Sequence, residues 1–159
     1  MNKEEYDQVS GILQHTIQTA DMAEGLSAAL GESIPKLTFL PVVLQTNAAQ
    51  TILEVTSVLV CLSGPSAIEP PLTLDCDVRV RLLRVRDGCE LYDARFSYYG
   101  SSHTLREWAT SDGADLRKEL GAACIHLSHH IAEQIFLVHN LPESPAQERV
   151  LPWPPQNRR

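Results

Sequence analysis

A chain of 159 residues, of which 43% are hydrophobic, is large enough to enclose one ordinary core and shows no sign of a second. Its formal net charge of -7 excludes the basic footprint with which proteins bind nucleic acid or anionic lipid. No apolar run is long enough to span a bilayer, so we expect no membrane insertion of this chain. We expect a single domain over residues 1–140 and a Pro-rich, extended tail over residues 141–159.

The first part of the chain, from Glu4 to about Ile34, carries apolar residues at helical spacing. Asp21 can cap a new segment within it, which predicts two helices or one bent helix. Gly31 and Pro35 are expected to end this helical region. The next run, Lys36 to Leu44, is apolar and β-branched, and it is compatible with an edge strand.

The most regular pattern, Leu72 to Tyr99, predicts a β-hairpin in which apolar and polar residues alternate on both sides of Arg86-Asp87-Gly88. A two-residue loop would mix apolar and charged side chains on one face. A three-residue loop, with Gly88 in the left-handed conformation and Val85 paired with Cys89, separates them. We therefore expect the three-residue loop.

This register gives the hairpin one buried face and one solvent face. The buried face is expected to hold Leu74, Cys76, Val78, Val80 and Leu82 against Tyr92, Ala94, Phe96 and Tyr98. The solvent face is expected to hold Asp75, Asp77, Arg79 and Arg81 against Asp93, Arg95 and Ser97, with Arg81 and Asp93 as a cross-strand charge pair. The segment Thr51 to Leu62 is a further strand, expected to pair with the first strand of the hairpin.

A short helix is predicted at Thr104 to Thr110, and a long helix from about Asp115 to Val138. The long helix has an apolar stripe that can cover the sheet, made of Leu116, Leu120, Cys124, Leu127, Ile131, Ile135 and Val138. The elements together predict an α+β fold. In this two-layer sandwich, a mainly antiparallel sheet of three to four strands is covered by the long C-terminal helix and by an N-terminal helix or helix pair.

The long helix carries a second apolar line, roughly opposite the first, made of Ala122, Ile125, Ala132 and Phe136. We favour packing of the N-terminal helix over this line. In the alternative, Ile125 and Phe136 form the centre of an interface, most simply that of a two-fold homodimer. Trp153, in the Pro-rich tail, is expected to dock into a groove of the body or of a neighbouring copy. The possible interface residues are therefore Ile125, Ala132, Phe136 and Trp153.

Two groups of polar residues have spacings that metal sites use. Asp75 and Asp77 share one strand face, but the arginines on the same face favour a solvated ladder of charges. His126 and His130 lie one helical turn apart with Glu133 nearby, yet the fragment lacks the Glu that zinc peptidases carry after the first His. We interpret both groups as polar surface.

The sequence patterns that could indicate a catalytic nucleophile are also weak. Gly100-Ser-Ser-His103 places hydroxyls beside an imidazole without a third group, and we interpret it as a loop that ends the hairpin. Cys124 and His126 fall on different sides of the helix. The four cysteines show no CxxC spacing, and their apolar settings predict buried free thiols. We predict no catalytic, cofactor-binding or metal-binding residues, and we do not expect an enzyme.

The order of elements and a few short motifs resemble uncharacterised proteobacterial envelope lipoproteins and, more distantly, small α+β domains of outer-membrane assembly and transport-auxiliary lipoproteins. The likeness covers roughly Met22 to Val138. It rests on Arg81–Val85, the Asp-Gly turn, the aromatic pair Tyr98-Tyr99, the Glu107-Trp108 element and Ile131–Ile135. It implies a non-enzymatic domain, periplasmic or associated with the outer membrane in the parent protein, that acts through a protein partner or a second copy of itself.

A different class of function is a small-ligand-binding or enzymatic α+β domain that uses the arginine and histidine groups. A contact domain requires an exposed apolar patch, whereas a ligand site requires a concave pocket with converging polar groups. The segment Met1 to Asp7 lacks the apolar core of a signal peptide. A cytoplasmic location is therefore expected if the chain is full length.

Overall fold

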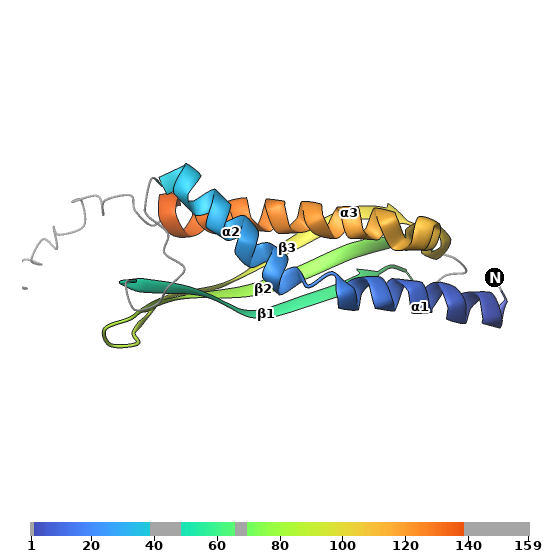
Figure 1. Cartoon of the computed structure of the whole chain (residues 1–159), viewed down its shortest axis with the longest axis horizontal. Helices are drawn as coiled ribbons and strands as arrows, with labels where there is room; N and C mark the ends of the chain where they lie inside the picture. The colour runs from blue at the N-terminus through green and yellow to red at the C-terminus, as the bar shows by residue number, and fades with distance from the viewer. Residues whose placement is uncertain (1, 39–48, 66–69, 139–159) are drawn as a thin grey trace, which may run out of the picture.

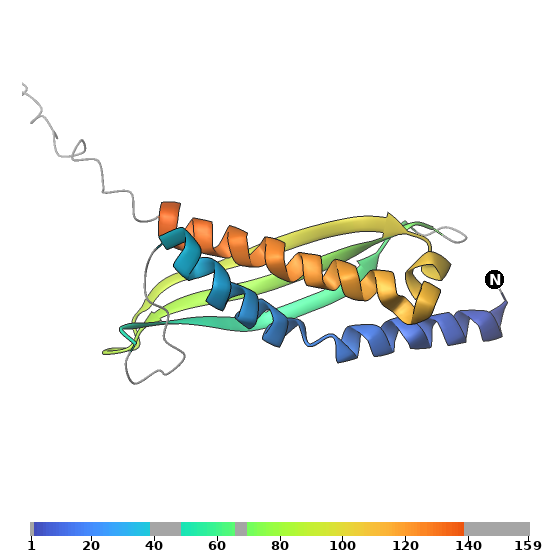
Figure 2. The same ribbon diagram turned by 45° about the horizontal axis from the view of Figure 1, so that its top comes forward.

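The structure is a computed structural model that describes residues 2–38, 49–65 and 70–138. It has the predicted α+β architecture, in which helices lie on one face of a three-stranded antiparallel sheet of order β1-β2-β3. The elements are α1 (Lys3–Thr19), α2 (Met22–Thr38), β1 (Thr51–Ser63), β2 (Leu72–Arg84), β3 (Glu90–His103), α3 (Leu105–Ala132) and the π-helix η2 (Glu133–Val138). Figure 1 and Figure 2 show α2 and α3 side by side on the sheet. In both views α1 lies at the end of the molecule at which α3 begins.

The three strands pair as the alternation predicts. β1 is antiparallel to the first strand of the hairpin, with one irregularity between Val55 and Ser57. Within the hairpin, Cys76 lies opposite Tyr98 and Leu82 opposite Tyr92, so the predicted register holds along the body of β2 and β3. Because side chains alternate between faces with a period of two, this register fixes which residues meet the helices.

The turn of the hairpin is longer than predicted. In place of a loop closed by Val85 and Cys89, the amide of Arg84 donates to the carbonyl of Cys89 at 2.9 Å. Leu91 is left unpaired as a bulge in β3 and absorbs the extra residue, which restores the predicted register beyond it. Gly88 has φ of +66°, the left-handed conformation expected at this turn.

The buried face of the hairpin is confirmed over the first part of β2 and at Phe96 on β3. Five residues on it are buried, namely Leu74, Cys76, Val78, Val80 and Phe96. Leu82, Tyr92, Ala94 and Tyr98, predicted to be buried, are only partly so. Leu82, Tyr92 and Ala94 lie toward the hairpin tip, which extends past the ends of α2 and α3 (Figure 1).

On the solvent face the charges pair differently from the prediction. Arg81 and Asp93 are opposite in the register, but their side chains reach to other neighbours. Arg79 Nε donates to Asp93 Oδ1 at 2.8 Å, and Arg81 Nε donates to Glu90 Oε2 at 2.8 Å. Long guanidinium side chains reach diagonal neighbours on a sheet as readily as opposite ones. Arg95 is exposed, as predicted.

The helical N-terminal region divides at Asp21, as predicted. The Oδ1 atom of Asp21 accepts a hydrogen bond from the amide of Glu24 at 3.0 Å, which caps the start of α2. The capped break lets α1 and α2 take different directions. α1 packs mainly against α3.

The predicted end of the helical region at Gly31 and Pro35 is wrong, because α2 continues through Pro35 to Thr38. A proline removes one backbone donor from a helix interior. Here Ile34, only 7% exposed, anchors the same turn in the core, so burial outweighs that loss. Residues 36–38 of the expected strand are therefore helical, and the rest of it lies outside the described residues.

The segment Gly100–His103, predicted to be a loop, is the last part of β3. The short and long C-terminal helices are both confirmed, and they meet at a kink inside α3 at residues 110–113. Thr104 and Glu107 form a capping box at the start of α3, with the Thr104 amide 2.7 Å from Glu107 Oε2.

The core is closed by a tryptophan at one end and a pair of hydroxyls at the other. Trp108 is 1% exposed, and its Nε1 donates to the carbonyl of Leu72 at 2.8 Å, which ties the start of β2 to α3. Ser33 and Ser128, both buried, lie 3.1 Å apart through their hydroxyl oxygens and join α2 to α3. The indole nitrogen of Trp108 and the hydroxyls of Ser33 and Ser128 thus each have a partner, as burial requires.

Candidate interaction surface

The side of α3 that faces away from the core carries one large exposed apolar residue, Ile125, with 61% of its surface exposed. The predicted inner stripe of this helix is buried from Leu116 to Ile135. The outer side is a line of exposed residues that continues into the first residue of η2. We call it the α3 outer stripe, and it consists of Lys118, Ala122, Ile125, His129 and Glu133. These positions recur every three or four residues, so they share one helix face.

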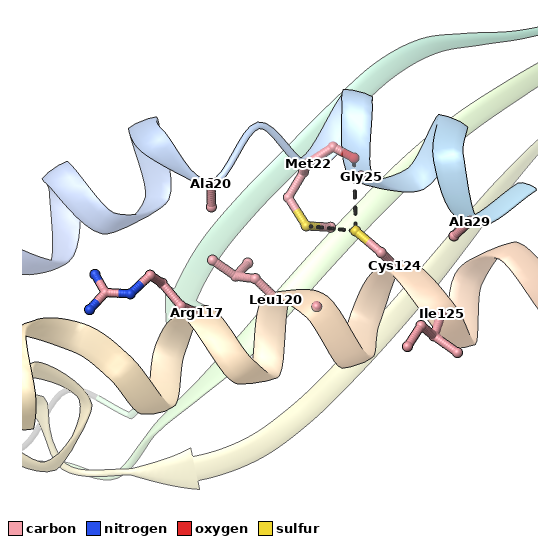
Figure 3. A pocket seen from close by; sticks show the side chains of 9 residues that line it. Ala20, Met22, Gly25, Ala29, Arg117, Leu120, Cys124 and Ile125 are labelled. Atoms are coloured by element: carbon pink, nitrogen blue, oxygen red, sulfur yellow. Dashed lines mark hydrogen bonds between the residues drawn. The ribbon is translucent and has the colours of Figure 1, made fainter.

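A shallow hollow of about 380 Å³ borders this stripe, between α2 and α3. We call it the α2–α3 hollow. Its lining includes Met22, Gly25, Ala29, Gly121, Cys124 and Ile125. Figure 3 shows Met22 and Cys124 meeting between the two helices, where Cys124 Sγ lies 3.4 Å from Met22 Sδ.

Small residues create the hollow. Gly25 approaches so closely that a Cβ added there would lie 3.2 Å from Cys124 Sγ. A Cβ added at Gly121 would meet nothing within 4 Å. The close approach at Gly25 brings α2 against α3, and the missing side chain at Gly121 leaves a depression next to Ile125. This face therefore combines a protruding apolar group with a recess.

The predicted interface residues differ in their exposure to solvent. Ala132 is 0% exposed and Phe136 is partly buried against the core, whereas Ile125 stands in solvent. Ala132 lies one turn beyond Ser128, on the side of α3 that α2 covers. Trp153 and the tail lie outside the described residues.

The two histidines at metal-ligand spacing contact aromatic rings of β3. The ring of His126 lies 5.4 Å from that of Tyr98, and the ring of His130 lies 5.3 Å from that of Phe96. The two imidazole centroids are 6.5 Å apart. Across residues 2–38, 49–65 and 70–138, no group of three or more His, Cys, Asp or Glu side chains could hold a metal ion.

One carboxylate that the sequence pattern does not single out, Glu119, joins α3 to β3. Glu119 Oε1 accepts hydrogen bonds from the hydroxyl of Tyr98 and from the amide of Ser101, both at 2.9 Å. Burial and the Glu119 contact raise the pKa of Tyr98 to about 12. Partial burial acts to raise the pKa of Glu119, but the hydrogen bonds from Ser101 and Tyr98 together bring it below its ordinary value. The hydrogen bonds of Glu119, Tyr98 and Ser101 therefore hold α3 against β3.

The other candidate groups are also engaged in structural contacts. Asp75 and Asp77 accept hydrogen bonds from the hydroxyls of Ser63 and Ser97, in keeping with a polar ladder. Ser102 contacts the Thr73 hydroxyl at 2.6 Å. The ring of His103 packs on that of Trp108 at 4.6 Å. The hydroxyl and the imidazole of this segment thus face different neighbours.

All four cysteines are free. Cys76 and Cys124 are buried as expected, but Cys61 and Cys89 are exposed, which corrects the prediction. Cys61 points to the solvent face of β1, opposite Asp75, and Cys89 follows the hairpin turn. Apolar neighbours in sequence do not ensure burial on a sheet with one open face.

Within the part of the chain that the structure describes, none of the helices has the length and apolar character needed to cross a membrane. No protein-family model, no curated protein and no solved structure matches this chain.

Proposed function

We propose that this chain is a non-enzymatic domain that works by protein contact, as part of a bacterial cell-envelope lipoprotein. The observation that carries the contact function is the position of Ile125. It is 61% exposed on α3 and borders the apolar α2–α3 hollow. Single exposed apolar residues are common on protein surfaces, but an exposed residue beside an apolar recess is the arrangement in which contact residues insert into pockets.

Burial of this surface would favour association. About 25 cal/mol is gained for each Å² of apolar surface removed from water. The small residues Gly25, Ala29 and Gly121 offer a recess into which a partner side chain fits without displacing a bulky one. The cysteine and methionine sulfurs beneath it are polarizable and adapt to the shape of an occupant.

The envelope part of the proposal is supported by the resemblance in element order and in the Glu107-Trp108 element. In the structure this element has a defined purpose, because Glu107 caps α3 and Trp108 fastens α3 to Leu72. A lipoprotein domain of this kind is tethered to a membrane by its parent protein and needs an exposed contact surface.

The test places a photoreactive residue at position 125 of the chain, expressed from its native locus in the source cells. The same residue at Arg95, exposed on the solvent face of the sheet, is the matched control. We expect position 125 to give a discrete crosslinked product in the envelope fraction, and the control to give none. Equal labelling at both positions, or a product confined to the cytoplasmic fraction, would contradict the proposal.

A further inference from the structure

Within that proposed contact function, we propose that the partner at the α3 outer stripe is a second copy of this chain, packed antiparallel about a two-fold axis near Ile125. The inference rests on the proposed function and adds the identity of the partner. It follows from the order of charged, small and apolar residues along the stripe.

The charges on the α3 outer stripes of two copies are complementary only when the two helices are antiparallel. Lys118 precedes Ile125 by seven residues and Glu133 follows it by eight. At 1.5 Å per residue these ions lie about 10 Å and about 12 Å from the centre, on opposite sides. A two-fold axis at Ile125 that reverses the helix therefore brings Lys118 of each copy next to Glu133 of the other.

The opposite orientation is disfavoured by the same charges. In a parallel pair Lys118 would face Lys118, and Glu133 would face Glu133, and like charges across an interface select against that arrangement. Within the described ranges, neither Lys118 nor Glu133 makes an ion pair. Both are exposed and available to a partner.

The centre of the stripe allows the two helices to approach closely. Gly121 and Ala122 precede Ile125 by about one turn, and both are exposed. In the antiparallel pair, Ile125 of one copy meets Ile125 of the other, and the Gly121 step, where an added Cβ would meet nothing within 4 Å, lies opposite His129 of the other copy. The apolar α2–α3 hollow borders this step, so no bulky side chain holds the two helices apart there. The same surface of each copy thus meets itself, as a two-fold interface requires.

The experiment measures the mass of the full chain in solution by sedimentation equilibrium over a range of concentrations. The wild type is expected to approach the mass of a dimer. Ile125→Ser is expected to give a monomer with an unchanged circular dichroism spectrum, because Ile125 is exposed and contributes little to the core. Glu4→Lys, an exposed change on α1, is the control and is expected to leave the dimer intact.

Charge reversal then tests the orientation. Lys118→Glu alone or Glu133→Lys alone creates two like-charge contacts and is expected to weaken self-association by about tenfold or more. An equimolar mixture of the two single variants restores both ion pairs and is expected to dimerise like the wild type. The double variant K118E/E133K is expected to do the same.

A wild type that stays monomeric at every concentration overturns the inference, as does a mixture that fails to restore the dimer. Failure of the inference and failure of the proposed function are distinguishable. A monomeric chain that crosslinks from position 125 to a different envelope protein retains the proposed function and excludes the second copy. A chain that does neither has no contact at this surface.

Discussion

Glu119 on α3 and Tyr98 on β3 are joined by a hydrogen bond of 2.9 Å from the phenol to the carboxylate Oε1. The same oxygen accepts the amide of Ser101 at 2.9 Å, so one carboxylate fastens the helical layer to the edge strand. Gly100 lies against it, because a Cβ added at Gly100 would come within 2.6 Å of Glu119 Oε1. Hydrogen bonds to charged acceptors are about twice as strong as those between neutral groups.

Glu119→Ala is expected to lower the free energy of unfolding by about 1–3 kcal/mol, because it leaves the Tyr98 hydroxyl and the Ser101 amide without their acceptor. The pKa of Glu119 is lower in the folded chain than its ordinary value, so its contribution is present above the unfolded pKa and is lost as pH falls through the folded pKa. Urea unfolding of wild type and variant from neutral to acidic pH measures both effects. Asp7→Ala, exposed on α1, is the control. A difference between Glu119→Ala and wild type that persists unchanged at low pH would contradict the charged role.

Phe96→Ala is expected to cost about 3–5 kcal/mol of stability, because the ring is 4% exposed and its removal leaves a cavity under α3. Arg79→Ala, on the opposite face of the same hairpin, is expected to leave stability nearly unchanged, since its ion pair with Asp93 is exposed to solvent. Denaturant midpoints of the two variants provide the comparison. Equal losses in both would mean that the two faces are not buried as the register requires.

Gly113→Ala and Gly88→Ala separate backbone strain from steric conflict. Both glycines have positive φ, +75° and +66°, so an L side chain is strained at either position. At Gly88 an added Cβ meets nothing, and we expect a loss of about 1 kcal/mol, the cost of the left-handed conformation. At Gly113 the Cβ would lie 2.5 Å from Thr16 Oγ1, and we expect a clearly larger loss that also loosens α1. Thermal unfolding of the two variants should rank them in that order.

Thiol labelling should divide the four cysteines into two pairs. Cys61 and Cys89 are exposed and should react with a maleimide in the native protein, whereas Cys76 and Cys124 should react only on unfolding. Burial raises the pKa of Cys76 to about 12, so its thiolate is scarce at neutral pH. Mass spectrometry after brief labelling should find two modified residues. Rapid native labelling of Cys76 would show that the sheet face opens readily.

The hairpin could be predicted from sequence because alternation has a period of two, and only one register separates apolar Val78 and Phe96 from the charges. The turn could not, because a bulge at Leu91 allows a longer loop without changing the faces. The end of α2 could not be predicted for a related reason. Local rules stop a helix at Pro35, but burial of Ile34 is a property of the assembled core.

The surface that we propose for contact could be predicted in part. A second apolar line on α3 includes Ile125, and the favoured expectation that an N-terminal helix covers this line is wrong there, because Ile125 is 61% exposed. The same line also pointed to Ala132, which is fully buried. The α2–α3 hollow could not be predicted, since it forms where Gly25 and Gly121, distant in sequence, lie on neighbouring helices. The two glycines come to line one hollow only when α2 packs against α3.

The sheet order β1-β2-β3 has a kinetic consequence. Each strand pairs with the next one along the chain, so the sheet can assemble by closing short loops, whose entropic cost is small. The hydroxyl pair that joins α2 to α3 connects Ser33 with Ser128, 95 residues apart. Low contact order favours rapid formation of the strands and α3. We therefore expect the N-terminal helices, whose contacts with α3 span a long stretch of chain, to dock after the sheet has formed.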